Sequence, residues 1–285
     1  MIMIRTMKDT EIEAILSLRR KLFGDFFENR FRNYIKKNPG SILVADSDNK
    51  ENKILGYAFA YPWRSSEGVV HHLYSSDDHQ NEIECELLNR LEQNFLKKEL
   101  RGMRIMVRED QRSLIRNLNA LDFKLETELV TFENDDLTAM DILDLGNKKV
   151  ELKDFENQFI DDIIEVETKC FKPSWHQSKE DFLSFGKRQN VWFKVAFVQD
   201  DMVGYLQIMA SGGLGHLGRV AVLPEYQRNG IGTRIVSEAM KWFNLKEVKK
   251  IKLRSPLDNS PAHSLYRKFG FREIGKEFDF YKKLE

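Results

Sequence analysis

The feature of this chain that most constrains its fold is an internal duplication. Short apolar stretches in the first half recur in the second half at a constant separation of 148 residues. Leu55-Gly56-Tyr57 aligns in this way with Val203-Gly204-Tyr205, and Leu121-Asp122-Phe123 aligns with Phe269-Gly270-Phe271. A period of this length exceeds that of solenoid repeats, so each copy is expected to be a whole domain.

Both copies show the same order of expected elements. Each opens with a short strand and an amphipathic helix, and two strands joined by a polar turn follow. A further strand then leads into a long helix, a strand, a second helix and a final pair of strands. This alternation predicts an α/β (mixed α+β) fold, with a mixed, mostly antiparallel sheet flanked by helices in each copy. The expected domains are residues 1–134 and 150–285, joined by the acidic linker 135–149.

The composition excludes several classes of protein. The 45 basic and 45 acidic side chains balance, so no overall field favours nucleic acid or an anionic membrane. There is no apolar run long enough to span a bilayer, no signal-peptide pattern, and only Cys85 and Cys170 for a disulfide framework. We therefore expect a cytoplasmic protein, monomer or homodimer, without nucleic-acid or membrane partners. No His/Cys cluster has the spacing of a metal site, so no metal is expected.

The segment 220–234 of the second copy predicts an anion-binding turn. A short apolar strand is followed by a basic turn with Gly230 and Gly232, and apolar residues at helical spacing run from Ile231 to Trp242. The first N–H groups of such a helix lack intrahelical partners, and the helix dipole adds positive charge, so a pyrophosphate is the natural guest. The turn is neither a P-loop nor the dinucleotide fingerprint, because the Gly-Lys-Ser/Thr and the third glycine are missing.

A second motif lies downstream of this turn. Asn259, Tyr266, Gly270 and Phe271 follow the order Asn-x6-Tyr-x3-Gly-Phe. Together the two motifs resemble the GNAT superfamily of N-acetyltransferases, in a tandem arrangement of two copies. The resemblance implies that the second copy transfers an acetyl group from acetyl-CoA to a primary amine by direct attack. The amine belongs to a small molecule or a peptide, and its identity stays open.

The resemblance also implies roles for single residues. It assigns acetyl-CoA binding to Val220, Ala221, Val222, Gln227, Arg228, Asn229, Gly230, Ile231, Gly232, Thr233 and Asn259. The strand backbone would pair with the pantetheine amides, the loop would wrap the pyrophosphate, and Asn259 would contact the pantetheine arm. Tyr266 would be the general acid at the sulfur, because a phenol with a pKa of about 10 keeps its proton at neutral pH. Each role has a structural alternative. The loop could be an ordinary turn, Tyr266 could be a packed helix residue, and Asn259 could be a helix N-cap.

The general base is left open by the sequence. In the ribosomal-protein alanine acetyltransferase branch a glutamate stands five residues before the asparagine, whereas Arg254 stands there in this chain. His216 is the candidate for this role, directly or through water, with Asp258 and Glu225 as further candidates. An amine that arrives partly deprotonated needs no base. Trp175 is either near the acceptor or a core aromatic residue.

The first copy is expected to keep the fold without the cofactor site. Glu82 and Glu84 stand 148 residues before Gly230 and Gly232, and Leu118 stands in the place of Tyr266. A pyrophosphate would meet repulsion at such a loop. The alternative function for the whole chain is a non-catalytic regulator or scaffold that binds acetyl-CoA.

Overall fold

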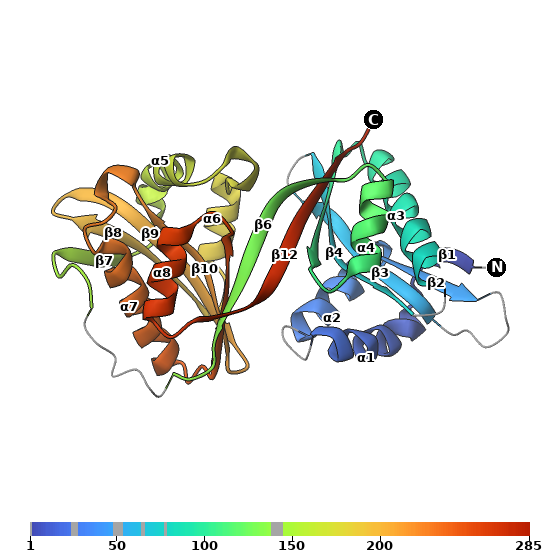
Figure 1. Cartoon of the computed structure of the whole chain (residues 1–285), viewed down its shortest axis with the longest axis horizontal. Coiled ribbons are helices and arrows are strands. Elements are labelled where there is room, and N and C mark those ends of the chain that lie inside the picture. Colours follow the sequence, from blue (N-terminus) through green and yellow to red (C-terminus); the bar gives the residue numbers. More distant parts are fainter. Residues whose placement is uncertain (1, 24–27, 48–53, 64–65, 77–78, 138–144) are drawn as a thin grey trace. The chain divides into compact units, whose positions relative to one another are not determined.

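The computed structural model describes residues 2–23, 28–47, 54–63, 66–76, 79–137 and 145–285. Its contacts divide the chain into two compact units, Met1–Leu129 with Gly275–Glu285 and Val130–Ile274. Each unit is a sheet flanked by helices (Figure 1), which confirms the α/β class with a mixed sheet.

The first unit has a sheet with the strand order β1-β2-β3-β4-β5-β12. Only β4 and β5 are parallel among its described strand pairs. The strands are β1 (Ile2–Thr6), β2 (Ile42–Ser47), β3 (Ile54–Trp63), β4 (Glu67–Ser75), β5 (Gly102–Arg108) and β12 (Arg272–Lys283). The helices are α1 (Ile12–Phe23), α2 (Glu28–Lys37), α3 (Gln80–Leu96) and α4 (Arg112–Ala120).

The second unit repeats this arrangement, with the strand order β6-β11-β10-β9-β8-β7. Here β10 and β11 are the parallel pair, and β7, β8, β9 and β10 pair antiparallel in turn. The strands are β6 (Lys124–Asn134), β7 (Val150–Asp154), β8 (Val191–Val198), β9 (Asp201–Ser211), β10 (Leu214–Val222) and β11 (Lys250–Pro256). The helices are α5 (Ile160–Cys170), α6 (Lys179–Gly186), α7 (Ile231–Leu245) and α8 (Ser260–Lys268).

The last strand of each copy departs from the expected boundaries 1–134, 135–149 and 150–285. Residues 277–283 of β12 pair antiparallel with β5, so the end of the chain completes the sheet of the first unit. The end of β6 from Val130 onward belongs to the second unit, where Phe132 is part of the core. Both strands are long, 11 and 12 residues, and each has residues in both units. Part of the expected linker, 138–144, lies outside the described residues.

The sheet of the second unit is buried on both faces. Helices α7 and α8 cover one face, where Ile231, Ile235, Ala239 and Trp242 are buried as their spacing predicts. Helices α5 and α6 cover the other face, which carries Tyr205 of β9. Because successive side chains of a strand alternate between faces, residues of β9 and β10 reach both layers.

None of the helices in the part of the chain that the structure describes is long and apolar enough to cross a membrane.

Candidate functional site

The two parallel strands of the second unit separate partway along their length. Their pairing covers only Leu214–His216 with Lys250–Lys252, although β10 continues to Val222 and β11 continues to Pro256. The register of β10 against β9 shifts at Gly218, and a bulge of this kind bends a strand. Beyond His216 the described strands therefore enclose a gap with backbone edges on both sides.

The backbone of β10 alternates between β9 and this gap. The N–H of Leu223 donates to the C=O of Val203 at 2.9 Å, and hydrogen-bonded pairs alternate along an antiparallel ladder. By this alternation Ala221 bonds to β9, whereas Val220 and Val222 turn their N–H and C=O groups toward the gap. Of the three expected strand residues, Ala221 therefore has no backbone group on the gap side.

Two side chains reach the gap edge at Val222. Its C=O accepts a hydrogen bond from Nε2 of Gln227 at 2.9 Å and another from Sγ of Cys170 at 3.3 Å. Gln227 thus folds back onto the strand, and Cys170 is tied to it from α5. The backbone groups of Val220 are left as the nearest ones for an extended ligand to pair with.

The loop before α7 presents backbone donors. Gly230 is the N-cap residue of α7 with φ 74°, a left-handed conformation that suits glycine. Asn147 donates from its N–H to the C=O of Gly230 and from Nδ2 to the C=O of Asn229, both at 3.1 Å. The N–H groups of residues 231–233 donate to no other described residue, and no side chain caps them. Together with the exposed Arg228, they form a positive helix end.

Tyr266 lies on α8, on the same face of the sheet as α7. Its ring packs against Phe132 and Phe271 with centroids 5.9 and 6.0 Å away, and the residue is 8% exposed. Burial raises the pKa of Tyr266 to about 12, so the hydroxyl keeps its proton at neutral pH. That hydroxyl forms no hydrogen bond with another described residue. The packed-tyrosine alternative and the proton-donor role are thus compatible.

Asn259 is the N-cap of α8, as one alternative predicted. Its Oδ1 accepts a hydrogen bond from the N–H of Ala262 at 3.3 Å. The Nδ2 group donates to no other described residue, so the side chain has a donor left for a ligand. Asn259 is exposed and follows the end of β11, at the mouth of the gap.

His216 lies where the two strands part. It pairs in register with Lys252, and loss of hydration together with the positive charge of Arg254 lowers the pKa of His216 to about 4. The imidazole is therefore neutral at pH 7 and binds a proton only weakly. Asp258 and Glu225 are exposed. The site residues expected from the sequence thus lie around β10, α7 and α8, with a weak candidate for the base.

A buried cluster that sequence reasoning missed lies on the opposite face of β10. Glu167 of α5 is 1% exposed and pairs with Arg219, with 2.8 Å between Oε1 and Nη1. The Tyr205 hydroxyl also donates to this carboxylate. The signal was present, because Glu167 falls among the apolar residues of the amphipathic helix at the spacing of its buried face.

The first unit holds a carboxylate where the second has its glycine loop. Helix α3 begins at Gln80, which is three residues earlier than α7 after the 148-residue offset, so a helical turn replaces the loop. Glu84 lies inside this helix, 2% exposed, and accepts hydrogen bonds from four side chains. The donors are Ser75 at 3.0 Å, Gln80 at 2.9 Å, Ser113 at 3.1 Å and Asn117 at 2.7 Å. The segment of the first copy that aligns with the glycine loop is therefore a helical turn with a buried, hydrogen-bonded carboxylate, whereas the expectation was an open acidic loop.

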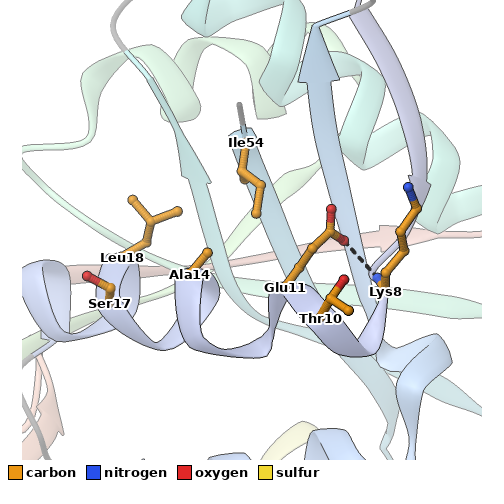
Figure 2. A pocket seen from close by; sticks show the side chains of 7 residues that line it. All are labelled: Lys8, Thr10, Glu11, Ala14, Ser17, Leu18 and Ile54. Atoms are coloured by element: carbon orange, nitrogen blue, oxygen red, sulfur yellow. Dashed lines mark hydrogen bonds between the residues drawn. The ribbon is translucent and has the colours of Figure 1, made fainter. Parts of the chain in front are cut away.

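The first unit also has a surface pocket of about 490 Å³ beside α1. Figure 2 shows its lining side chains, with the carboxylate of Glu11 close to the backbone of Lys8, whose N–H donates to it at 2.7 Å. Arg5 also binds Glu11, at 2.6 Å. The pocket contains none of the residues that the sequence singled out for chemistry.

Known proteins resemble parts of this chain in sequence. Residues 160–271 match the acetyltransferase (GNAT) family. An N-alpha-acetyltransferase of Sulfurisphaera tokodaii is 34% identical over 108 residues, a match that covers 33% of this chain and 64% of that relative. A putative [ribosomal protein bS18]-alanine N-acetyltransferase of Bacillus subtilis is 24% identical over 135 residues, covering 47% of this chain and 87% of that relative. This chain thus spans less than two thirds of the archaeal relative.

The whole chain resembles solved structures in its fold. A tandem GNAT protein from the clavulanic acid biosynthesis pathway has a TM-score of 0.74 at 12% identity, covering 100% of this chain and 99% of that chain. This likeness shows that the whole chain has the fold of a tandem GNAT protein. Within this fold, the segment that matches the acetyltransferase (GNAT) family is residues 160–271 of the second copy.

Proposed function

We propose that this protein is an N-acetyltransferase that transfers the acetyl group of acetyl-CoA to a primary amine. The observation that carries the proposal is the combination of two features on one strand-loop-helix segment. The backbone of Val220 faces the gap between β10 and β11, and the helix end that follows has three N–H groups without described partners. A pantetheine arm needs the first feature, and a pyrophosphate needs the second.

The expected cofactor contacts divide accordingly. The N–H groups of residues 231–233 and the guanidinium of Arg228 would bind the pyrophosphate, and Gly230 gives the loop its left-handed turn. Val220 would pair with the pantetheine amides as a neighbouring strand would. Nδ2 of Asn259 would donate to the same arm, while its Oδ1 caps α8.

The reaction needs one bond to form and one to break. The amine nitrogen attacks the acetyl carbon, the carbon–sulfur bond breaks, and the amide and the free thiol are the products. Tyr266 would donate to the leaving sulfur, where negative charge develops. The proton that the amine loses would pass to His216 or to water, so that the overall proton balance is restored through solvent. With a pKa of about 4, His216 would act as a weak base.

Calorimetric titration with acetyl-CoA tests the proposal. The wild type should bind one acetyl-CoA per chain, and the double variant Gly230→Glu, Gly232→Glu should bind none, because two carboxylates would face the pyrophosphate. The double variant Asn244→Glu, Leu245→Glu is the matched control, since it adds the same charge at the exposed far end of α7. No binding by the wild type would contradict the proposal, and two sites per chain would contradict a degenerate first copy.

A regulator that binds acetyl-CoA without turnover is the second candidate. Arg254 stands near His216 and favours its neutral form, so the described residues offer no strong base close to the gap. A screen of primary amines with thiol release as the readout separates the two functions. The acetyltransferase releases thiol with at least one amine, and the regulator with none.

A further inference from the structure

The segment between α5 and α6 is attached to β10 by side-chain contacts. This acceptor-side segment, Phe171–Gln177, contains a short 3-10 turn at Pro173–Trp175. The guanidinium of Arg219 donates to the C=O of Trp175 and lies 4.2 Å from the centre of the Phe171 ring. The N–H of Gln177 donates to Oε1 of Glu167 at 2.7 Å. One ion pair therefore holds both ends of the segment.

The ion pair between Glu167 and Arg219 is buried, and burial favours a single fixed geometry. The Glu167 side chain is 1% exposed and that of Arg219 is 15% exposed, with 2.8 Å between the charged atoms. A buried pair of this kind resists separation, because removing one partner leaves an uncompensated charge. Tyr205 supplies a further hydrogen bond to the carboxylate from the sheet below.

The pair also connects the acceptor-side segment to the gap. Arg219 follows the bulge at Gly218, where β10 has just parted from β11. Cys170, the residue before the segment, donates from Sγ to the C=O of Val222 at 3.3 Å. The segment thus lies on the face of β10 that carries Tyr205, whereas Tyr266 belongs to the core on the other face.

We propose that Glu167 and Arg219 are positioning residues that hold the acceptor-side segment over the gap and so keep water from the acetyl thioester. This inference rests on the proposed acetyltransferase function. Water competes with the amine for a thioester, and a site that excludes water prevents this side reaction. Phe171, Pro173 and Trp175 give the segment the apolar side chains that such a cover needs.

The test measures thiol release from acetyl-CoA in the absence of any amine. Glu167→Gln should raise this hydrolysis about fivefold, the factor that one hydrogen bond of ordinary strength represents. Its affinity for acetyl-CoA in calorimetry should stay within about twofold of the wild type, since the segment lies on the other face of the strand. Amide hydrogen exchange in residues 171–177 should become faster. Glu165→Gln is the matched control, because it breaks an exposed pair with Lys169 on the same helix.

Arg219→Lys provides a second, milder variant. It keeps the charge but loses the forked geometry, so hydrolysis should rise by less than in Glu167→Gln. If Glu167→Gln does not fold, Arg219→Lys decides the matter by the same readout. Faster exchange without faster hydrolysis would overturn the proposal, since the segment would then have no shielding role. A wild type that does not bind acetyl-CoA would overturn the proposed function itself, and this inference with it.

Discussion

At the scale of single residues, the chemistry of the site depends on how burial shifts the pKa values of its side chains. Tyr266 keeps its proton because burial raises its pKa to about 12, and His216 stays neutral because its pKa is lowered to about 4. Neither shift can be read from the residue type. Both pKa shifts follow from burial of the side chain, to which the positive charge of Arg254 adds at His216.

Substituting Tyr266→Phe should lower the rate of acetyl transfer about a hundredfold, the lower end of what general acid–base catalysis contributes. The affinity for acetyl-CoA should be unchanged, because the ring and its packing are retained. Steady-state kinetics and calorimetry measure the two effects. Tyr57→Phe is the control, since it removes a buried hydroxyl of the first unit that has no described partner. An unchanged rate in Tyr266→Phe would remove this residue from the mechanism.

At the scale of elements, equivalent helices of the two copies have different beginnings. Both α3 and α7 bury an apolar stripe against their sheet. Helix α7 starts after a glycine loop, whereas α3 starts at Gln80, three residues earlier after the 148-residue offset, and its N-cap His79 is left-handed with φ 61°. The carboxylate of Glu84 in the second turn of α3 accepts hydrogen bonds from side chains of β4, α3 and α4.

Substituting Glu84→Gln should destabilise the first unit by about 1–3 kcal/mol, because a buried amide NH₂ would face the donors Ser113 and Asn117. Urea unfolding measures the change. Glu82→Gln, an exposed neighbour on the same helix turn, should have almost no effect. If both variants unfold at the wild-type urea concentration, the hydrogen bonds to Glu84 do not stabilise this unit.

At the scale of the whole molecule, the first unit depends on the last strand of the chain. Asp279 of β12 is buried there, and its Oδ2 lies 2.6 Å from Nη1 of Arg104. Glu67 and Glu126 face the same guanidinium, so three carboxylates surround one positive charge. Burial raises the pKa of Asp279 to about 6 in spite of Arg104. The last strand, β12, therefore carries a carboxyl group whose pKa is higher than that of an ordinary aspartate.

Asp279 should make the first unit less stable as the pH rises. A group whose folded pKa is raised binds its proton more tightly in the folded state, so its stabilisation is complete below about pH 4 and is lost as the pH rises through about 6. Asp279→Asn should therefore gain stability relative to the wild type between pH 4 and pH 7, by an amount on the order of 3 kcal/mol. Denaturant unfolding at the two pH values tests this.

A suitable control is an aspartate whose pKa is shifted in the opposite direction, downward. The guanidinium of Arg272 lowers the pKa of the exposed Asp135, so the stabilisation by this carboxylate is lost only as the pH falls below about 4. The stability of Asp135→Asn relative to the wild type should therefore change little between pH 4 and pH 7. A difference between Asp279→Asn and the wild type that is the same at both pH values would contradict the role assigned to burial.

The features that depend on neighbours along the chain could be predicted from the residues alone. The stripe from Ile231 to Trp242 predicted α7, and the motif from Asn259 to Phe271 predicted a last helix, which is α8. Glu84 in place of a glycine predicted a degenerate first copy. These features follow from helical periodicity and from the backbone freedom of glycine, which act over a few residues.

The pairing of each last strand and the pairs of buried charges depend on contacts between distant segments, and the fold was needed to reveal them. Nothing in the pattern of β12 says that its end pairs with Gly102–Arg108, and nothing near Glu167 points to Arg219, 52 residues away. A strand offers the same edge to many partners, and a carboxylate accepts from any donor that reaches it. The choice is made by the free energy of burying groups that are distant in sequence, which local spacing does not contain.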